Sequence, residues 1–367
     1  MARTVRLLTA DLHYRPGIQV HTATSGAIDA LSEIYLAVEQ DAALLGCAEI
    51  RLNIAYLTGL APDDIVAEAV AAVDAIDWGV GPQALLDALP SEAADSATPV
   101  RALIDCFLHD WAAREAGQPL ADWLGGHFSG AWPSNQTLFW CDDAALDDLT
   151  AGYLARGFRS LKLRVGLQDV AADLHRLTRL RAIAGPQAAL AVDVNGRWSL
   201  EQATAALRAM EPLDIAYAEQ PLPAGDWDGL RRLREATRIP VMLDESIGRP
   251  ADIETLLSVP DPPGAHLKIV KMGGIAPLLA AARRLRDAGV DVMVGQMNEG
   301  ALATAAAAHC AMVVQPRHAE LYGADGLVDD PAAGLGYADG RVVVPRGPGL
   351  GPVLNTDTTT EIFRKSL

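Results

Sequence analysis

The chain has few cysteines and fewer basic than acidic side chains. Its 367 residues carry a net charge of −17, which argues against a nucleic-acid partner and against docking on anionic membranes. The cysteines are scattered and lack the close spacing of a metal site: Cys47, Cys106, Cys141 and Cys310. We interpret them as buried thiols of a protein in the reducing cytoplasm.

Long hydrophobic runs are also missing. Residues 1–15 contain Arg3, Arg6 and Arg15, which leave no apolar stretch long enough for a signal peptide. The alanine-rich run from Ala301 to Val314 is too short to span a bilayer and contains His309. We therefore expect a cytoplasmic protein without a membrane partner. His309 lies in an apolar setting, and we expect it to be a core histidine with its hydrogen bonds satisfied rather than a ligand.

Half of the residues are hydrophobic, which permits a large core, and the length suits a barrel with a cap. In the first part, the segments 5–12 and 34–39 have the pattern of antiparallel strands. Helices are predicted from Pro62 toward Ile76 and from Pro99 to Ala116. From about Asn135 to Val344, strand-like runs alternate with amphipathic helices, which predicts parallel strands with crossover helices.

Three carboxylates follow three short apolar runs, about 25 residues apart, and are the most informative feature of the chain: Asp193, Glu219 and Asp244. This interval is about one strand-plus-helix unit of a (β/α) barrel, in which the carboxyl ends of the strands meet on one face. Three converging oxygen ligands without cysteine or histidine suit Mg²⁺. The alternative is that each acid simply caps the helix after its strand.

Cations flank these acids along the chain. Lys162 and Arg164 lie on the same face of an earlier strand, Lys268 lies at the strand after Asp244, and Glu299 follows the next strand. A metal ion beside lysines is suited to removing a proton next to a carboxylate, because the positive charges stabilise the resulting enediolate.

In these segments the sequence resembles the enolase superfamily, in the muconate-lactonizing-enzyme subgroup of the mandelate racemase/muconate lactonizing enzyme family. The matching segments extend over nearly the whole chain: Lys162-Leu163-Arg164, Asp193-Val194-Asn195-Gly196, Glu219-Gln220-Pro221, Asp244-Glu245-Ser246, Lys268-Ile269-Val270-Lys271-Met272-Gly273-Gly274 and Gly347-Pro348-Gly349-Leu350-Gly351. The resemblance implies a (β/α)7β TIM-like barrel over residues 128–346 behind an N-terminal α+β capping domain over residues 1–127. Residues 347–367 would return to the cap.

The resemblance also implies a metal site and a base. Asp193, Glu219 and Asp244 would bind Mg²⁺, with Mn²⁺ as the alternative ion. Asn195 would orient a ligand or a bound water, or be a plain turn residue, and Glu245 would compete with Asp244 as a ligand. Lys268 would be the general base, with its pKa lowered by the nearby positive charge.

Arg164 departs from the subgroup, which usually carries Lys-x-Lys at this place. Arginine stays protonated in proteins, so it is a poor base, although it can bind a carboxylate through two hydrogen bonds. One-base chemistry through Lys268 therefore fits better than two-base racemisation. Lys162 would contact the substrate carboxylate. The alternative is that both cations are structural.

Further residues fall where the family binds its substrate. Glu299 would bond to the substrate or support Lys268, or be an ordinary acid at a helix start. Glu320 lies where relatives bind an ammonium group with paired aspartates, but the second position is Tyr322, which weakens the case for a dipeptide. The cap segments 21–26 and 51–56 match the family's two specificity loops. Within the second, we expect a polar set to touch the distal end of the substrate: Arg51, Asn53 and Tyr56.

The sequence therefore predicts a Mg²⁺-dependent enzyme that abstracts the α-proton of a small carboxylate substrate, most simply as a muconate-cycloisomerase-like isomerase. The alternatives are an acid-sugar or hydroxy-acid dehydratase and a racemase or epimerase. A non-catalytic metal-binding barrel is disfavoured because the three acids and Lys268 are all present. We also expect a homo-oligomer.

Overall fold

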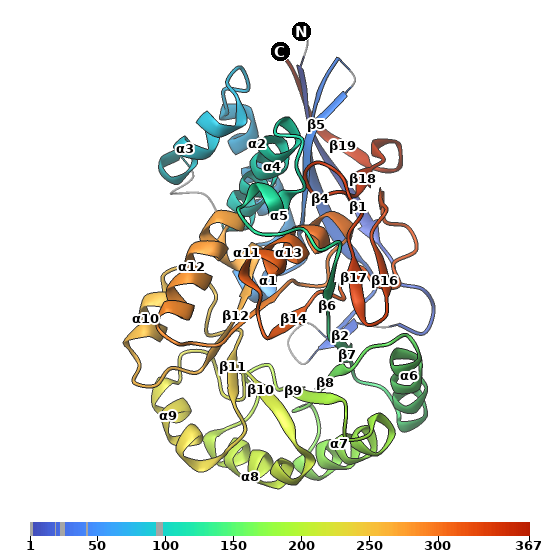
Figure 1. Cartoon of the computed structure of the whole chain (residues 1–367), viewed down its shortest axis with the longest axis vertical. Coiled ribbons are helices and arrows are strands. Elements are labelled where there is room, and N and C mark those ends of the chain that lie inside the picture. Colours follow the sequence, from blue (N-terminus) through green and yellow to red (C-terminus); the bar gives the residue numbers. More distant parts are fainter. Residues whose placement is uncertain (1–2, 19, 23–25, 42, 93–97) are drawn as a thin grey trace.

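The computed structural model describes residues 3–18, 20–22, 26–41, 43–92 and 98–367. Figure 1 shows two parts, a cap that holds both chain ends and a barrel with an outer ring of helices. Across the described residues, no helix combines the length and the apolar character that crossing a bilayer requires. The cysteines are free thiols, and Cys141 is the one that is only partly buried.

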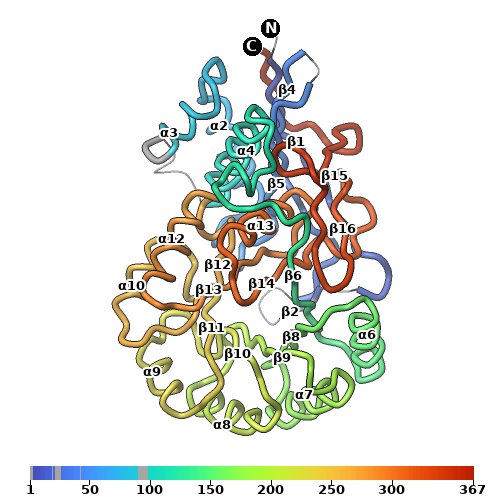
Figure 2. Tube along the Cα trace, in the orientation of Figure 1, coloured from blue at the N-terminus to red at the C-terminus, as the bar shows by residue number. Residues whose placement is uncertain are grey.

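The cap is built on an antiparallel sheet with the strand order β19-β1-β4-β5. Its strands are β1 (Arg3–Leu12), β4 (Leu31–Gln40), β5 (Ala43–Arg51) and β19 (Thr360–Ser366). Because β19 pairs with β1, the last strand of the chain completes the sheet that the first strand begins, and Figure 2 shows the two ends together. Three helices accompany this sheet: α2 (Pro62–Ala75), α3 (Pro82–Glu92) and α4 (Thr98–Glu115).

The barrel contains eight parallel strands paired in chain order. They are β7 (Gln136–Leu138), β8 (Ser160–Arg164), β9 (Ala189–Asp193), β10 (Ile215–Glu219), β11 (Val241–Leu243), β12 (Gly264–Lys268), β13 (Val292–Gly295) and β14 (His318–Glu320). The Asn135 backbone N–H donates to the Ala319 carbonyl at 3.0 Å, which links the two ends of the sheet. Apolar residues dominate these strands, as expected for a parallel sheet covered by helices.

Helices surround the strands, as Figure 1 shows: α6 (Asp143–Ala155), α7 (Val170–Ala184), α8 (Leu200–Met210), α9 (Trp227–Ala236), α10 (Asp252–Ser258), α12 (Ile275–Asp287) and α13 (Ala301–Val314). Local sequence sets where several of them begin. Ser199 and Gln202 form a capping box at α8, and Asp142, Asp169 and Asp226 cap α6, α7 and α9. The barrel with an N-terminal cap that the sequence predicts is therefore confirmed.

Smaller elements connect the two parts. Short helices are α1 (Ala55–Thr58), α5 (Leu120–Trp123) and α11 (Ile269–Met272), with 3₁₀ turns η1 (Glu211–Leu213) and η2 (Thr356–Thr358). Strands β2 (Val20–Thr22) and β3 (Gly26–Ile28) form a hairpin. Strands β16 (Gly336–Ala338), β17 (Arg341–Val343) and β6 (Ala131–Pro133) form one small sheet, and β15 (Ala332–Ala333) pairs with β18 (Val353–Leu354). The sequence analysis did not predict these small sheets.

Candidate active site

The strand ends bring the predicted charged residues to one face of the barrel. Arg164, Asp193 and Glu219 are the last residues of β8, β9 and β10, and they lie side by side in the sheet register. Asp244 directly follows β11, and Lys268 ends β12. All of these side chains are buried. The regular spacing in the sequence is thus converted into a group of opposite charges at the carboxyl ends of neighbouring strands.

The three acids are not helix caps. The helices that follow their strands are capped by Ser199 and Asp226, and α10 begins after Ala251 without a side-chain cap. The carboxylates instead point at cations and at His266. The capping alternative for these acids is therefore wrong.

Lysines occupy the space between the acids. Lys162 Nζ lies 2.7 Å from Glu219 Oε2 and 3.5 Å from Asp193 Oδ2. Lys268 Nζ lies 2.7 Å from Asp244 Oδ2, and Lys271 Nζ lies 2.5 Å from Asp244 Oδ1. The three proposed ligands are buried carboxylates, a donor set that fits Mg²⁺. A divalent ion at this place would share these oxygens with the lysines.

The cations keep two of the acids ionised. Burial alone would raise the pKa of Glu219, but Lys162 and His266 outweigh it and lower that pKa. Burial acts in the same direction on Asp244, and Lys268 with Lys271 lowers its pKa well below the usual value. For Asp193, burial prevails over the nearby Arg164 and raises the pKa to about 6. Deprotonated acids of this kind are what a metal ion requires.

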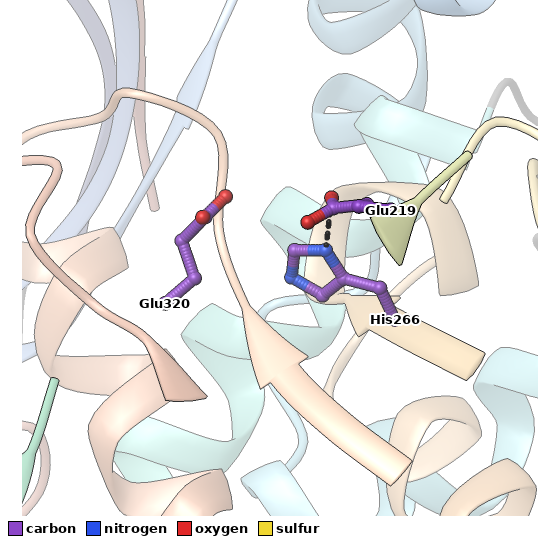
Figure 3. Close-up of side chains that lie close together, drawn as sticks. All are labelled: Glu219, His266 and Glu320. Carbon is purple, nitrogen blue, oxygen red and sulfur yellow. Dashed lines mark hydrogen bonds and ion pairs between the residues drawn. The ribbon is translucent and has the colours of Figure 1, made fainter. Parts of the chain in front are cut away.

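His266, which the sequence analysis did not single out, lies among the metal-site residues. Its Nδ1 is 3.0 Å from Glu219 Oε1 (Figure 3), and the imidazole is fully buried. Glu219, His266 and Glu320 offer ligand atoms within 4.8 Å of one another. The alternation of side chains along a strand was the available signal, because His266 precedes Lys268 by two residues and shares its face.

Arg164 is bound on two sides. Its guanidinium donates to the Asp193 carboxylate and, at 3.0 Å, to Asn195 Oδ1. Burial lowers its pKa, but Asp193 outweighs this effect and raises the pKa well above the usual value. Arg164 therefore remains a cation. Asn195 in turn donates to Glu245 Oε1 at 3.0 Å, which places it between the arginine and the acid.

Glu245 points to the same cavity as its neighbours but differs from them in charge. Burial and the adjacent Asp244 charge raise its pKa to about 8. Its Oε2 has no hydrogen-bond partner among the described residues. In this arrangement Asp244 is the ionised member of the pair, so Asp244 is the better ligand of the two.

Lys268 differs from the expectation of a lowered pKa. Burial lowers the pKa of this lysine, but the Asp244, Glu320 and Glu219 charges outweigh burial and raise it. The expectation assumed a metal ion nearby, whereas here Asp244 pairs with the lysine. Lys271, to which the sequence assigned no role, is 1% exposed and bonds to Asp244 and the His266 carbonyl.

Lys162 is fully buried between acids rather than open to a substrate. It contacts Glu219, Asp193 and the Glu320 carboxylate. Glu320 also accepts from Asn135 Nδ2 at 3.2 Å. Glu320, which the resemblance suggested as an ammonium-binding acid, is therefore already paired with a cation of the chain.

A cavity of about 50 Å³ lies between the cap and the barrel at these residues. Arg164, Asp244 and Lys268 border it from the barrel, and Arg51 and Tyr56 border it from the cap. A larger cavity of about 730 Å³ shares Leu57 and Glu245 with it. The predicted base Lys268 and Arg164 line the smaller cavity, whose size requires side chains or loops to move before a substrate enters.

The predicted substrate residues divide into two groups. Arg51, Tyr56 and Glu320 line the cavity. Asn53 and Glu299 do not line it. Asn53 accepts from Arg51 Nε at 2.6 Å and donates to the Ala30 carbonyl, so it supports the arginine. Glu299 accepts from the Met297 backbone N–H at 3.0 Å, which orders the loop after β13.

The two cap segments lie over the barrel mouth as far as they are described. Val20 and Ile28, which flank the segment 21–26, line the cavity together with Arg51 and Tyr56. Residues 23–25 lie outside the described residues. His309 also fits its expectation, because Nδ1 accepts from the Ala121 N–H and Nε2 donates to the Leu350 carbonyl in the core.

Residues 145–358 match the enolase C-terminal domain-like family. This chain belongs to the enolase superfamily, in the mandelate racemase/muconate lactonizing enzyme family. An L-Lys-D/L-Arg epimerase from Methylococcus capsulatus is 35% identical over 274 residues, which cover 72% of this chain and 74% of the relative. The relatives are isomerases, and so this chain is an enzyme of the same superfamily.

Solved structures give the same assignment. A dipeptide epimerase from Methylococcus capsulatus, complexed with Mg and the dipeptide L-Arg-D-Lys, superposes with a TM-score of 0.86 at 30% identity, covering 95% of this chain and 98% of that chain. A muconate lactonizing enzyme from Pseudomonas fluorescens, complexed with muconolactone, has a TM-score of 0.86 at 26% identity and covers 96% of both chains. Proton abstraction with Mg²⁺ is general to this family, and its reactions differ between these neighbours.

Proposed function

We propose that this enzyme removes the α-proton of a small carboxylate substrate with Lys268 as its single base, in a cycloisomerase-like isomerisation that depends on Mg²⁺. The observation that supports the proposal is that the two cations lining the cavity differ in their ability to lose a proton. Lys268 and Arg164 both line it, but Arg164 is an arginine bound to Asp193 and Asn195. An arginine does not titrate in this range, so it cannot act as the second base.

Lys268 has the position and the chemistry of the base. Its ammonium is held by Asp244 within the described structure. A ligand role for Asp244 withdraws part of that carboxylate charge from Lys268, which favours the neutral amine that a base requires. Lys271 stays bonded to the Asp244 backbone carbonyl at 2.8 Å and keeps the acid in place.

Asp193, Glu219 and Asp244 would hold the ion, which supplies positive charge against the negative charge that develops on the substrate carboxylate. Arg164 faces the cavity as a permanent cation and stabilises the same charge from the chain itself. Lys162 holds Glu219 and Asp193 in place from the buried side. Val20, Ile28 and Tyr56 cover the cavity and exclude water.

Epimerisation is the second candidate, because the epimerases from Methylococcus capsulatus are similar to this chain. It needs a second group that can give and take a proton on the far side of the substrate. Dehydration of an acid sugar or hydroxy acid uses one base and differs from isomerisation in its product. A homo-oligomeric state, a cytoplasmic location and the use of Mn²⁺ remain predictions.

A substrate screen in D₂O tests the proposal. Acid sugars, N-acylamino acids, dipeptides and muconates are incubated with the enzyme and Mg²⁺, and α-deuterium is followed by NMR, with EDTA as the control. We expect deuterium exchange with one of these classes, lost with EDTA and lost in Lys268→Ala. Exchange that persists in Lys268→Ala, or a folded, Mg²⁺-bound enzyme inert toward all four classes, would overturn the proposal.

A further inference from the structure

A buried histidine lies beside two of the proposed metal ligands. His266 is on β12, two residues before Lys268, and it is 0% exposed. Its Nδ1 lies 3.0 Å from Glu219 Oε1 and 3.8 Å from Asp244 Oδ1. It therefore contacts one proposed ligand directly and lies near a second.

The contact with Glu219 decides which ring nitrogen must carry a proton. A carboxylate oxygen only accepts, so Nδ1 carries the proton and donates it to Glu219. Nε2 has no hydrogen-bond partner among the described residues. On the neighbouring strand, a Cβ at Gly295 would lie 2.1 Å from Nε2, so the absence of a side chain there leaves room for the imidazole.

Glu219 is consequently held at both oxygens. His266 Nδ1 donates to Oε1, and Lys162 Nζ lies 2.7 Å from Oε2. Asp244 is also held at both oxygens. Lys271 Nζ donates to Oδ1, and Lys268 Nζ donates to Oδ2. Each acid thus accepts from two buried donors, one at each oxygen, and of the two lysines at Glu219 Oε2 and Asp244 Oδ2 only Lys268 lines the cavity.

We propose that His266 is a positioning residue for the metal ion: by donating from Nδ1 to Glu219 Oε1 it fixes this carboxylate, whose Oε2 the divalent ion would share with Lys162. The inference rests on the proposed function only in assuming that Glu219 binds a divalent ion. Donors behind a ligand commonly set its orientation, and their loss weakens metal binding by about 10–100-fold.

Direct ligation by the histidine is the competing arrangement. Glu219, His266 and Glu320 lie close enough to surround an ion, and Figure 3 shows their side chains converging. The Lys162 ammonium, however, bonds to both carboxylates. The Nδ1 atom is also committed to Glu219, so the geometry favours a histidine that orients the ligand.

Calorimetric titration of the full chain with Mg²⁺ tests the role. His266→Asn places an amide N–H near the Nδ1 position, and we expect its Kd to stay within about threefold of wild type. His266→Leu keeps the bulk without a donor, and its Kd should rise by about 10–100-fold. His318→Leu, a change on β14 where the histidine packs against Tyr217, is the matched control and should leave Kd unchanged.

Thermal melts check that each variant is folded. If His266→Leu does not fold, His266→Gln replaces it, because its amide reaches the Nε2 position and misses Glu219. Wild-type affinity in a folded His266→Leu or His266→Gln overturns the inference. So does a nitrogen coupling from His266 to Mn²⁺ bound to wild type, seen by pulsed EPR, since it shows direct ligation.

The same samples separate this inference from the proposed function. Wild-type protein is assayed in parallel for α-proton exchange. Normal Mg²⁺ binding with the expected loss in His266→Leu, but no exchange with any substrate class, supports the role of His266 and contradicts the proposed function. α-Proton exchange in wild type together with unchanged Mg²⁺ affinity in His266→Leu supports the proposed function and contradicts the role of His266.

Discussion

The Lys268 side and the Arg164 side of the cavity are built alike but differ in chemistry. On each side a lysine or arginine that lines the cavity is paired with an acid, and a buried lysine holds the same acid from behind. Lysine can lose its proton when its acidic partner is shared, whereas arginine cannot. Two sites with the same charge therefore have different roles, a base on one side and a fixed cation on the other.

Removing the base gives the largest expected effect. Lys268→Ala should reduce α-proton exchange by about 10³-fold or more, because a positioned base contributes at that scale and Arg164 cannot replace it. The measurement is deuterium uptake in D₂O with saturating Mg²⁺. A residual rate within tenfold of wild type would mean that both sides contribute bases, and the contrast between them would fail.

Exchanging the fixed cation for a titratable one sharpens the contrast. Arg164→Lys removes the guanidinium whose Nη1 donates to both Asp193 and Asn195, and we expect the native reaction to slow by about 10–100-fold. The new amine should also confer weak exchange on the second face of the substrate. Steady-state rates and NMR of the deuterated product measure both effects, and unchanged rates would show that Arg164 is only structural.

Asn195 connects Arg164 to Glu245, and we expect its substitution to reduce activity less than the substitution of Arg164. Asn195→Ala removes the acceptor for Arg164 and the donor to Glu245, and we expect kcat/KM to fall by about 3–10-fold. Asn195→Asp keeps the acceptor and serves as the comparison. If alanine has no effect while the fold is intact, Asp193 alone holds the arginine.

The cap side of the cavity should respond least in kcat. Arg51 bonds to Asn53 and to the Asn298 carbonyl at 3.3 Å, so Arg51→Ala should loosen the loop over the cavity and raise KM with kcat nearly unchanged. We also expect a loss of about 1.5–3 kcal/mol in stability, visible in denaturant unfolding. A fall in kcat alone would place Arg51 in the reaction instead.

Most residues of this site could be predicted from local sequence, and the others depend on contacts with residues far away in the sequence. Asp193, Glu219 and Asp244 could be found because each ends or directly follows a short apolar strand at a regular interval. Lys271 could not be recognised as buried, since its partners are the Asp244 side chain and carbonyl on another strand end. The bonds of Asn53 could not be predicted for the same reason, because its partners Ala30 and Ser32 lie on a different part of the cap.

The fold shows the same division. Alternating strands and helices predict the barrel, because each βα unit is a local pattern. The sheet that pairs β6 with β17 joins residues 131–133 to residues 341–343, and no local pattern announces such a pairing. A return of residues 347–367 to the cap was predicted from the resemblance to the family, but the pairing of β19 with β1 at the opposite end of the chain was not.

Face-resolved deuterium incorporation by the wild-type enzyme tests the central claim most directly. Both enantiomers of an active substrate are incubated separately in D₂O with Mg²⁺, and α-deuterium is followed by NMR before much product forms. With Lys268 as the single base, one enantiomer exchanges and the other stays protonated. Comparable exchange in both enantiomers would contradict the account, since it requires a second base on the Arg164 side.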